Sequence, residues 1–288
     1  MTGRAAALRA VAERLRRAGV ASAEHDAEAL LLHALGIPRA ALWSEPGAPM
    51  AAAEADALES LAAARERRVP LQLLLGEVPF HGVTIGTAPG VFVPRPETEV
   101  LVAAALEALG DPPPGTLLDL GAGTGAVAVA LLAALPGWRG VAVDRSRAAL
   151  ELAARNAARN GVAGRLLLLE ADFGDPAFAP PGAPLDALVA NPPYVRSGDI
   201  AGLEPEVRDH DPREALDGGP DGLDALRWMA SRLAGWIRPG GLFALEIGAD
   251  QADDAVGLFR PRSPDVRVLP DLAGRPRVLL GRLESRDA

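Results

Sequence analysis

Apolar residues in the first 78 positions recur at the spacing of amphipathic helices. Leu8, Val11 and Leu15 share one face of a first segment, because residues three and four apart are neighbours on a helix. A second segment begins after Ser22, which we expect to act as an N-cap, and it ends at Gly36. A third spans residues 50–68 approximately. We therefore predict a small helical domain over residues 1–78 that docks a partner.

The pattern changes between residues 71 and 93, where apolar residues are interleaved with glycines. Phe80 and Ile85 alternate with Gly82 and Gly86, which is typical of a β-hairpin with tight turns. We assign residues 79–94 to a hairpin linker and residues 95–288 to a second domain. The acidic residues that follow the linker open an apolar pattern at helical spacing.

From residue 116 onward, short apolar runs alternate with longer amphipathic segments. This alternation predicts an α/β domain with a mostly parallel sheet and helices on both faces. The last two runs have no helical pattern between them, so we expect an antiparallel hairpin at the sheet edge. The seven predicted strands are 117–120, 140–143, 166–169, 185–190, 242–247, 266–269 and 278–280.

Charge and composition argue against several classes of protein and of binding site. The net charge of −9 argues against a protein built to hold naked nucleic acid, which needs a basic face. Every basic side chain apart from histidine is Arg, so a P-loop would lack its lysine. The absence of cysteine excludes disulfides and thiolate sites and fits a reducing cytoplasm. We expect no metal site from the four scattered histidines, no signal peptide and no membrane span.

A glycine-rich turn follows the first predicted strand of the second domain. Its glycines let the backbone pass close to a ligand, where a Cβ would collide, and their spacing is neither that of a P-loop nor that of a dinucleotide fold. Asp144 ends the next strand, where an acid can accept hydrogen bonds from ribose hydroxyls. Asp172 and Phe173 follow the third strand and are expected to bracket an adenine. The expected cofactor-binding residues of the turn are Gly121, Ala122, Gly123, Thr124 and Gly125.

The tetrapeptide Asn191-Pro192-Pro193-Tyr194 comes directly after the buried run 185–190. Two prolines lack N–H donors and have fixed φ, so the turn is stiff and its carbonyls cannot join a ladder. Such a turn can present the side-chain oxygen of Asn191, a neighbouring carbonyl and the Tyr194 ring to one planar group with two N–H donors. An adenine amino group and a side-chain amide both satisfy this description.

With these residues in order on successive strands, the chain resembles class I S-adenosylmethionine-dependent methyltransferases, and more closely the HemK/PrmC family. That family comprises protein-(glutamine-N5) methyltransferases of peptide-chain release factors. The resemblance covers nearly the whole chain. It is carried by the segments 70–82, Val93–Glu99, Leu118–Gly125, Asn191–Tyr194, Ala215–Leu223 and Asp271–Arg277. One departure is His210-Asp211-Pro212, where an aromatic-acid-proline triplet is expected.

The resemblance implies a Rossmann-like, seven-stranded methyltransferase domain that uses S-adenosylmethionine and releases S-adenosylhomocysteine, with Asn191 also binding the cofactor. The substrate would be the Gln of the Gly-Gly-Gln loop of class-1 translation termination release factors, in the cytoplasm. Asn191 and the carbonyl of Pro192 would accept both N–H donors of that amide, while Pro193 and Tyr194 would complete the substrate site. Catalysis would consist of positioning and electrostatics, with Asn191, Pro192 and Tyr194 as the catalytic residues.

Two other readings remain at this point. The same tetrapeptide can hold the exocyclic amino group of a nucleic-acid base, as in an N6-adenine or guanine-amino methyltransferase. A non-catalytic cofactor-binding adaptor is the other reading, although the glycines and Asn191 are intact. For Arg95, Glu97 and Glu99, helix capping and salt bridges compete with a role in substrate contact.

Overall fold

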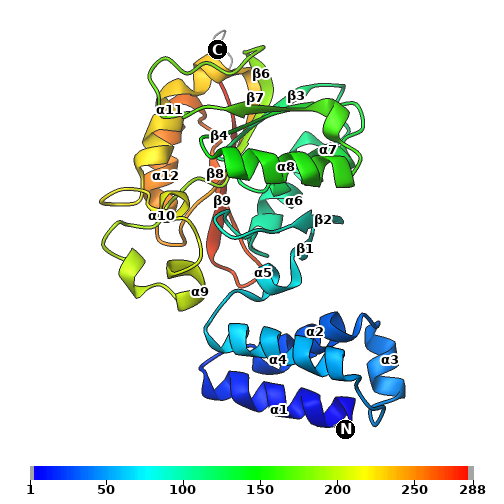
Figure 1. The fold of residues 1–288 in the computed structure, drawn as a ribbon. Helices are drawn as coiled ribbons and strands as arrows, with labels where there is room; N and C mark the ends of the chain where they lie inside the picture. Colours follow the sequence, from blue (N-terminus) through cyan, green and yellow to red (C-terminus); the bar gives the residue numbers. More distant parts are fainter. Residues whose placement is uncertain (1–2, 285–288) are drawn as a thin grey trace. The chain divides into compact units, whose positions relative to one another are not determined.

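The computed structural model describes residues 3–284, and the chain divides into two compact units (Figure 1). The first, the helical unit, consists of Met1–Glu77 together with the short segment Glu204–His210. The second, the sheet unit, consists of Val78–Leu203 and Asp211–Ala288. The domain boundaries at 78 and 94 remain predictions.

The helical unit has an apolar core to which each of its longer helices contributes. Leu15, Leu30 and Leu31 are fully buried there, together with Ala62. The second helix ends at Gly36 in the left-handed conformation, as predicted. The α-helices of the helical unit are α1 Arg4–Arg17, α2 Ala23–Leu35, α3 Arg39–Ser44, α4 Ala52–Glu66, α5 Leu71–Leu75 and α9 Pro205–Arg208.

Three local expectations for this region were wrong or incomplete. Ser22 occupies the N-cap position of α2, but its hydroxyl donates to Asp26 Oδ1 at 2.8 Å and makes no cap hydrogen bond. α3 and α5 were not predicted, because elements of six and five residues are too short to display a 3.6-residue period.

A buried ion-pair cluster fastens the segment Glu204–His210 within the helical unit. Arg65 lies on α4, and its side chain is only 6% exposed. It contacts Asp26 Oδ2 at 2.7 Å and Glu206 Oε1 at 2.8 Å. Arg68 donates to both oxygens of Glu206 at 2.6 Å. These hydrogen bonds outweigh the opposing effect of burial and lower the pKa of Glu206 to about 2.

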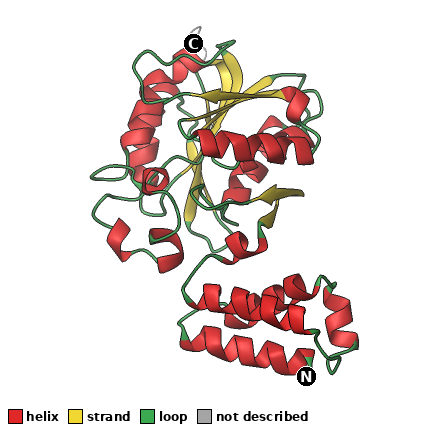
Figure 2. Ribbon diagram, viewed as in Figure 1, coloured by secondary structure: helices red, strands yellow, loops and turns green. Residues whose placement is uncertain are grey.

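The sheet unit contains a seven-stranded sheet in the order β5-β4-β3-β6-β7-β9-β8. Its strands are drawn as arrows among the helices of this unit (Figures 1 and 2). The first five strands in this order are parallel to one another, and β9 pairs antiparallel with β7 and β8. The strands are β3 Thr116–Leu120, β4 Arg139–Asp144, β5 Leu166–Glu170, β6 Leu185–Ala190, β7 Ile237–Glu246, β8 Arg267–Pro270 and β9 Pro276–Arg282. A separate hairpin pairs β1 Glu77–Phe80 with β2 Val83–Gly86.

Helices cover both faces of the sheet, so successive strand residues enter different cores. Leu117 packs with α6, α7 and α8, whereas its neighbour Leu118 packs with α11 and α12. This alternation explains why the strands of the parallel part are apolar at nearly every position. The α-helices of the sheet unit are α6 Thr98–Leu109, α7 Ala126–Ala134, α8 Arg147–Arg159, α10 Arg213–Leu216, α11 Asp224–Trp236 and α12 Ala252–Phe259.

The predicted fold class is confirmed, including the antiparallel hairpin with β8 at the edge. α12 was not predicted from the sequence. Over the described range 3–284, no helix combines the length and hydrophobicity that a membrane crossing requires. In the same range, no group of three or more His, Cys, Asp or Glu side chains is arranged to hold a metal ion.

Candidate active site

The glycine-rich turn lies where β3 ends and α7 begins. Gly121, Gly123 and Gly125 have φ values of +72°, +54° and +77°, a region that side chains with a Cβ rarely adopt. At Gly125 a Cβ would also lie 3.0 Å from the Cβ of Ala153 on α8. The backbone nitrogens of Gly121 and Ala122 donate to the carbonyl of Val143, which ties the turn to β4. The turn is therefore held by hydrogen bonds to β4 and by close packing against α8.

Asp144 ends β4 beside this turn. Its Oδ2 accepts a hydrogen bond from the nitrogen of Gly123 at 2.8 Å, and its Oδ1 accepts one from the nitrogen of Ser146 at 2.8 Å. A carboxylate offers about four lone-pair positions, so two remain for a ligand. The geometry brings Asp144 and the glycine-rich turn together, as the sequence predicts.

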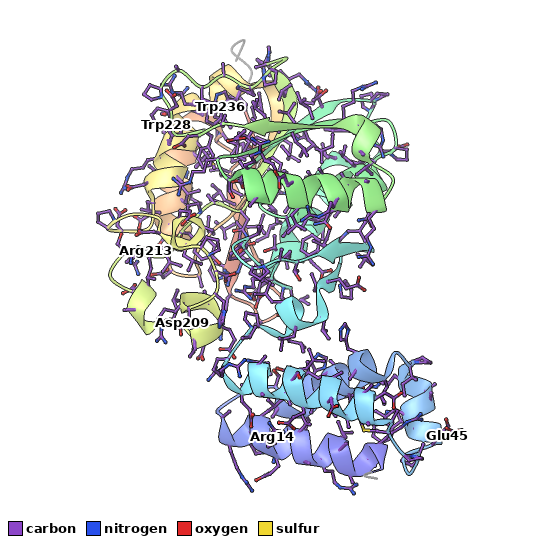
Figure 3. All side chains as sticks on the ribbon, viewed as in Figure 1. Arg14, Glu45, Asp209, Arg213, Trp228 and Trp236 are labelled. Carbon is purple, nitrogen blue, oxygen red and sulfur yellow. The ribbon has the colours of Figure 1, made fainter. Side chains whose placement is uncertain are left out.

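Asp172 and Phe173 follow β5, and they differ in their exposure and in their hydrogen bonds. Asp172 is exposed and accepts from the nitrogen of Gly174 at 2.7 Å. Phe173 is half-buried, and its carbonyl accepts from the indole N–H of Trp228 on α11, which is labelled in Figure 3. A Cβ placed on Gly121 would lie 3.9 Å from the Phe173 ring and 4.0 Å from the carbonyl oxygen of Asn191. The glycine-rich turn, the aromatic ring and the tetrapeptide thus meet at one end of the sheet.

The turn Asn191–Tyr194 leaves β6 at the carboxyl end of the strand, as predicted. Asn191 Nδ2 donates to the hydroxyl of Thr98, at the start of α6, over 3.1 Å. The hydroxyl of Tyr194 donates to Glu246 Oε1 at 3.2 Å. Pro192 is buried, whereas Asn191 and Tyr194 are half-buried, so both side chains remain partly accessible to a substrate.

A second glycine-rich loop, within the segment Ala215–Leu223, packs against the turn Asn191–Tyr194. The side-chain nitrogen of Gln251 donates to the carbonyls of Tyr194, at 3.1 Å, and of Gly222, at 3.0 Å. A Cβ on Gly222 would lie only 2.4 Å from the Tyr194 oxygen, and one on Gly218 would lie 2.8 Å from the Pro193 oxygen. The glycines of the segment Ala215–Leu223 are therefore required by the close approach of two backbones.

Two buried acids lie at the same end of the sheet. Glu246 ends β7 and is 1% exposed. Burial raises its pKa, although Thr98, Arg277 and Tyr194 act to lower it. Burial, together with the charge of Glu246, raises the pKa of Tyr194. Asp119, in β3, accepts from the nitrogen of Ala128 at 3.1 Å. Burial raises the pKa of Asp119 to about 7.

Arg95 and Glu99, which flank the start of α6, make structural contacts. Arg95 forms an ion pair with buried Asp211, and its guanidinium lies 5.3 Å from the centre of the Phe92 ring. Glu99 accepts from the nitrogen of His81 at 2.9 Å instead of capping the helix. Glu97 holds the N-cap position without a side-chain cap hydrogen bond. The departure at His210-Asp211-Pro212 thus retains the acid that pairs with Arg95.

Sequence reasoning missed Thr98, Glu246, Gln251 and Asp119 as residues of this region. A signal existed for the two acids, because each interrupts an otherwise apolar strand pattern. Thr98 stood inside a recognised segment but was not singled out there. No local signal marked Gln251, whose partner Tyr194 lies 57 residues earlier in the chain.

Comparison with known proteins covers both units. The family model described as the PrmC N-terminal domain matches residues 6–76, and the methyltransferase small domain matches residues 82–203. A release factor glutamine methyltransferase of Cereibacter sphaeroides is 44% identical over 96% of this chain and 97% of its own length. A protein of the same name from Moorella thermoacetica is 43% identical over 95% and 96% of the two chains.

Two solved structures share the fold over part of this chain. A T. thermophilus 16S rRNA methyltransferase in complex with AdoMet and guanosine aligns with a TM-score of 0.52 at 23% identity. It covers 72% of this chain and 50% of its own. A methyltransferase from Pyrococcus furiosus aligns with a TM-score of 0.51 at 16% identity, covering 71% of this chain and 90% of its own.

Proposed function

Because the chain belongs to the release factor glutamine methyltransferase family, we propose that it methylates the side-chain amide nitrogen, N5, of a release-factor glutamine. The methyl donor is S-adenosylmethionine, and the glutamine is that of the Gly-Gly-Gln loop of class-1 release factors. The observation that supports this most strongly is the placement of Asn191 beside both the glycine-rich turn and Phe173.

The residues at the carboxyl ends of β3, β4 and β5 fit the cofactor. Gly121–Gly125 provides a backbone surface without side chains, and Asp144 keeps lone pairs for ribose hydroxyls. Phe173 presents a ring for the adenine, with exposed Asp172 next to it. Bound there, S-adenosylmethionine supplies an electrophilic methyl group. Ala122 and Thr124 are buried and belong to the wall of the same site.

The turn after β6 fits an amide that has two N–H donors. An amide nitrogen is a poor nucleophile, because its lone pair is delocalised into the carbonyl. Asn191 Oδ1 and the Pro192 carbonyl accept both donors and align the nitrogen, and the Tyr194 ring packs against the amide plane beside Pro193. Positioning is the main contribution, and a displacement of about 1 Å costs roughly a hundredfold in rate.

The experiment combines methyl transfer with one variant. The full chain, S-adenosylmethionine and a class-1 release factor are incubated, and the Gly-Gly-Gln peptide is analysed by mass spectrometry. We expect one added methyl group on the glutamine. Asn191→Ala should retain cofactor affinity and lose transfer. Unchanged methylation by this variant would overturn the site assignment.

A parallel reaction offers nucleic acid in place of the release factor. The net charge of −9 provides little electrostatic attraction for a polyanion, so we expect no methylated base. Transfer to adenine or guanine, with none to the release factor, would replace the proposed function with the nucleic-acid alternative.

A further inference from the structure

Thr98 links two sequence segments that lie far apart in the chain. It opens α6 within the segment Val93–Glu99, is 3% exposed, and accepts a hydrogen bond from Asn191 Nδ2, 93 residues away. An asparagine side chain has one NH₂ group and one oxygen. With its NH₂ group turned toward Thr98, Asn191 has its oxygen, Oδ1, left for a substrate.

The contacts of Glu246 bear on the orientation of the Thr98 hydroxyl, and through it on that of Asn191. An ionised carboxylate only accepts hydrogen bonds, and Tyr194 already donates to its Oε1 at 3.2 Å. The hydroxyl of Thr98 also interacts with this carboxyl group. Oε2 is buried and has no well-formed hydrogen bond to any residue that the structure describes. Glu246 Oε2 can therefore accept a hydrogen bond from the Thr98 hydroxyl. With its proton directed to Glu246, this hydroxyl has its lone pairs facing Asn191.

We propose that Thr98 and Glu246 are positioning residues that make Asn191 an acceptor, so that the site selects a side-chain amide over a carboxylate. The inference rests on the proposed function. Glutamine and glutamate have the same shape, but the first places N–H donors where the second places lone pairs and charge. Asn191 Oδ1 pairs with the donors and repels the lone pairs. A site built to hydrogen-bond one group rejects an analogue that leaves its buried groups unpaired.

The test compares two release factors that differ only at the reacting residue, Gln in one and Glu in the other. The dissociation constant of each form is measured by isothermal titration calorimetry, and the Gln form is also measured as a substrate. Wild type should favour the Gln form. Thr98→Val keeps the shape but removes the hydroxyl that accepts from Asn191 and interacts with Glu246. We expect its KM for the Gln form to rise, and the discrimination to fall by about tenfold, the equivalent of one hydrogen bond.

Two further variants separate positioning from folding. Thr98→Ser restores the hydroxyl and should recover the discrimination. Glu246→Gln introduces an NH₂ group that can donate to Thr98, whose proton then turns toward Asn191 Oδ1. Asn191 would present its NH₂ group to the substrate, so the Glu form should gain affinity relative to the Gln form. A purely structural role would not shift preference in this direction.

The matched control is Thr116→Val at the opposite, amino end of β3, which should leave the preference unchanged. Cofactor affinity and the melting temperature are measured for every variant. Unaltered discrimination in both Thr98→Val and Glu246→Gln would overturn the inference. Absence of methyl transfer by wild type would instead overturn the proposed function, because the binding comparison is made independently of turnover.

Discussion

The carboxyl group of Asp144 accepts a hydrogen bond from the backbone nitrogen of Gly123 at 2.8 Å, so the acid that ends β4 also closes the turn that follows β3. Its second oxygen holds the nitrogen of Ser146, next to α8. One side chain therefore fixes the two neighbouring loops that form the proposed cofactor site.

Asp144→Asn should weaken S-adenosylmethionine binding by about tenfold or more. The amide has only one oxygen for two backbone donors, and hydrogen bonds to a charged group contribute about 1.5–3 kcal/mol. Isothermal titration calorimetry measures the affinity directly. Asp175→Asn is the control, because Asp175 also accepts from a backbone nitrogen, that of Ala177, in an exposed loop. Equal affinities for the two variants would contradict the prediction.

Gly222→Ala should lower kcat by roughly a hundredfold with cofactor affinity retained. The new Cβ would lie 2.4 Å from the Tyr194 oxygen and 2.6 Å from Gln251 Nε2, and a displaced turn misplaces the substrate nitrogen. Gly274→Ala is a matched control, since both glycines have φ of +78° but Gly274 has no atom within 4 Å of the added Cβ. Steady-state kinetics should show a loss for the first variant alone.

Asp119 should make the protein less stable as pH rises from about 4 to 7. Burial raises its folded-state pKa to about 7 from 3.8. In this window the unfolded carboxyl is ionised while the folded one keeps its proton. The free energy of unfolding therefore falls with pH, by at most about 1.4 kcal/mol per unit. Asp119→Asn removes this contribution. Urea unfolding at the two ends of the window should show a shallower decline for the variant, and parallel declines would refute the assignment.

Arg65→Met should cost about 3–5 kcal/mol of unfolding free energy. The substitution leaves buried Asp26 without its cation, while Glu206 keeps Arg68 alone. Breaking one side of a buried pair is strongly destabilising. Arg17→Met is the control, because Arg17 is 76% exposed and pairs with Glu13 on the surface, where an ion pair contributes at most about 1 kcal/mol. Denaturant unfolding of the full chain measures both, and similar losses would count against the cluster.

The sequence predicted those parts of the site that follow directly from strand ends. Asn191, Asp144 and the turn at Gly121 each stand immediately after an apolar run. The carboxyl ends of parallel strands meet at one edge of a sheet. Knowing the strands was therefore enough to bring these residues together.

Contacts between side chains that lie far apart in the sequence could not be predicted in this way. Helix capping, a salt bridge and substrate contact were the alternatives for Glu99, yet its carboxylate accepts from the nitrogen of His81 in the β1–β2 turn. Thr98 and Glu246 acquire their roles only when α6 and β7 both reach Asn191. The eight-residue helix α12 was missed because so short an element shows barely two turns of periodicity.

The membership of Glu204–His210 in the helical unit has a genetic consequence. Two separate stretches of the coding sequence encode the helical unit, and the proposed methyl-transfer residues Gly121–Tyr194 lie between them. A deletion of residues 1–77 would leave Glu206 without Arg65 and Arg68, and a transplanted N-terminal fragment would lack the same counter-charge. Recombination at one junction would therefore break the ion-pair cluster. An exchange of this unit between relatives must carry both stretches, or replace Arg65, Arg68 and Glu206 together.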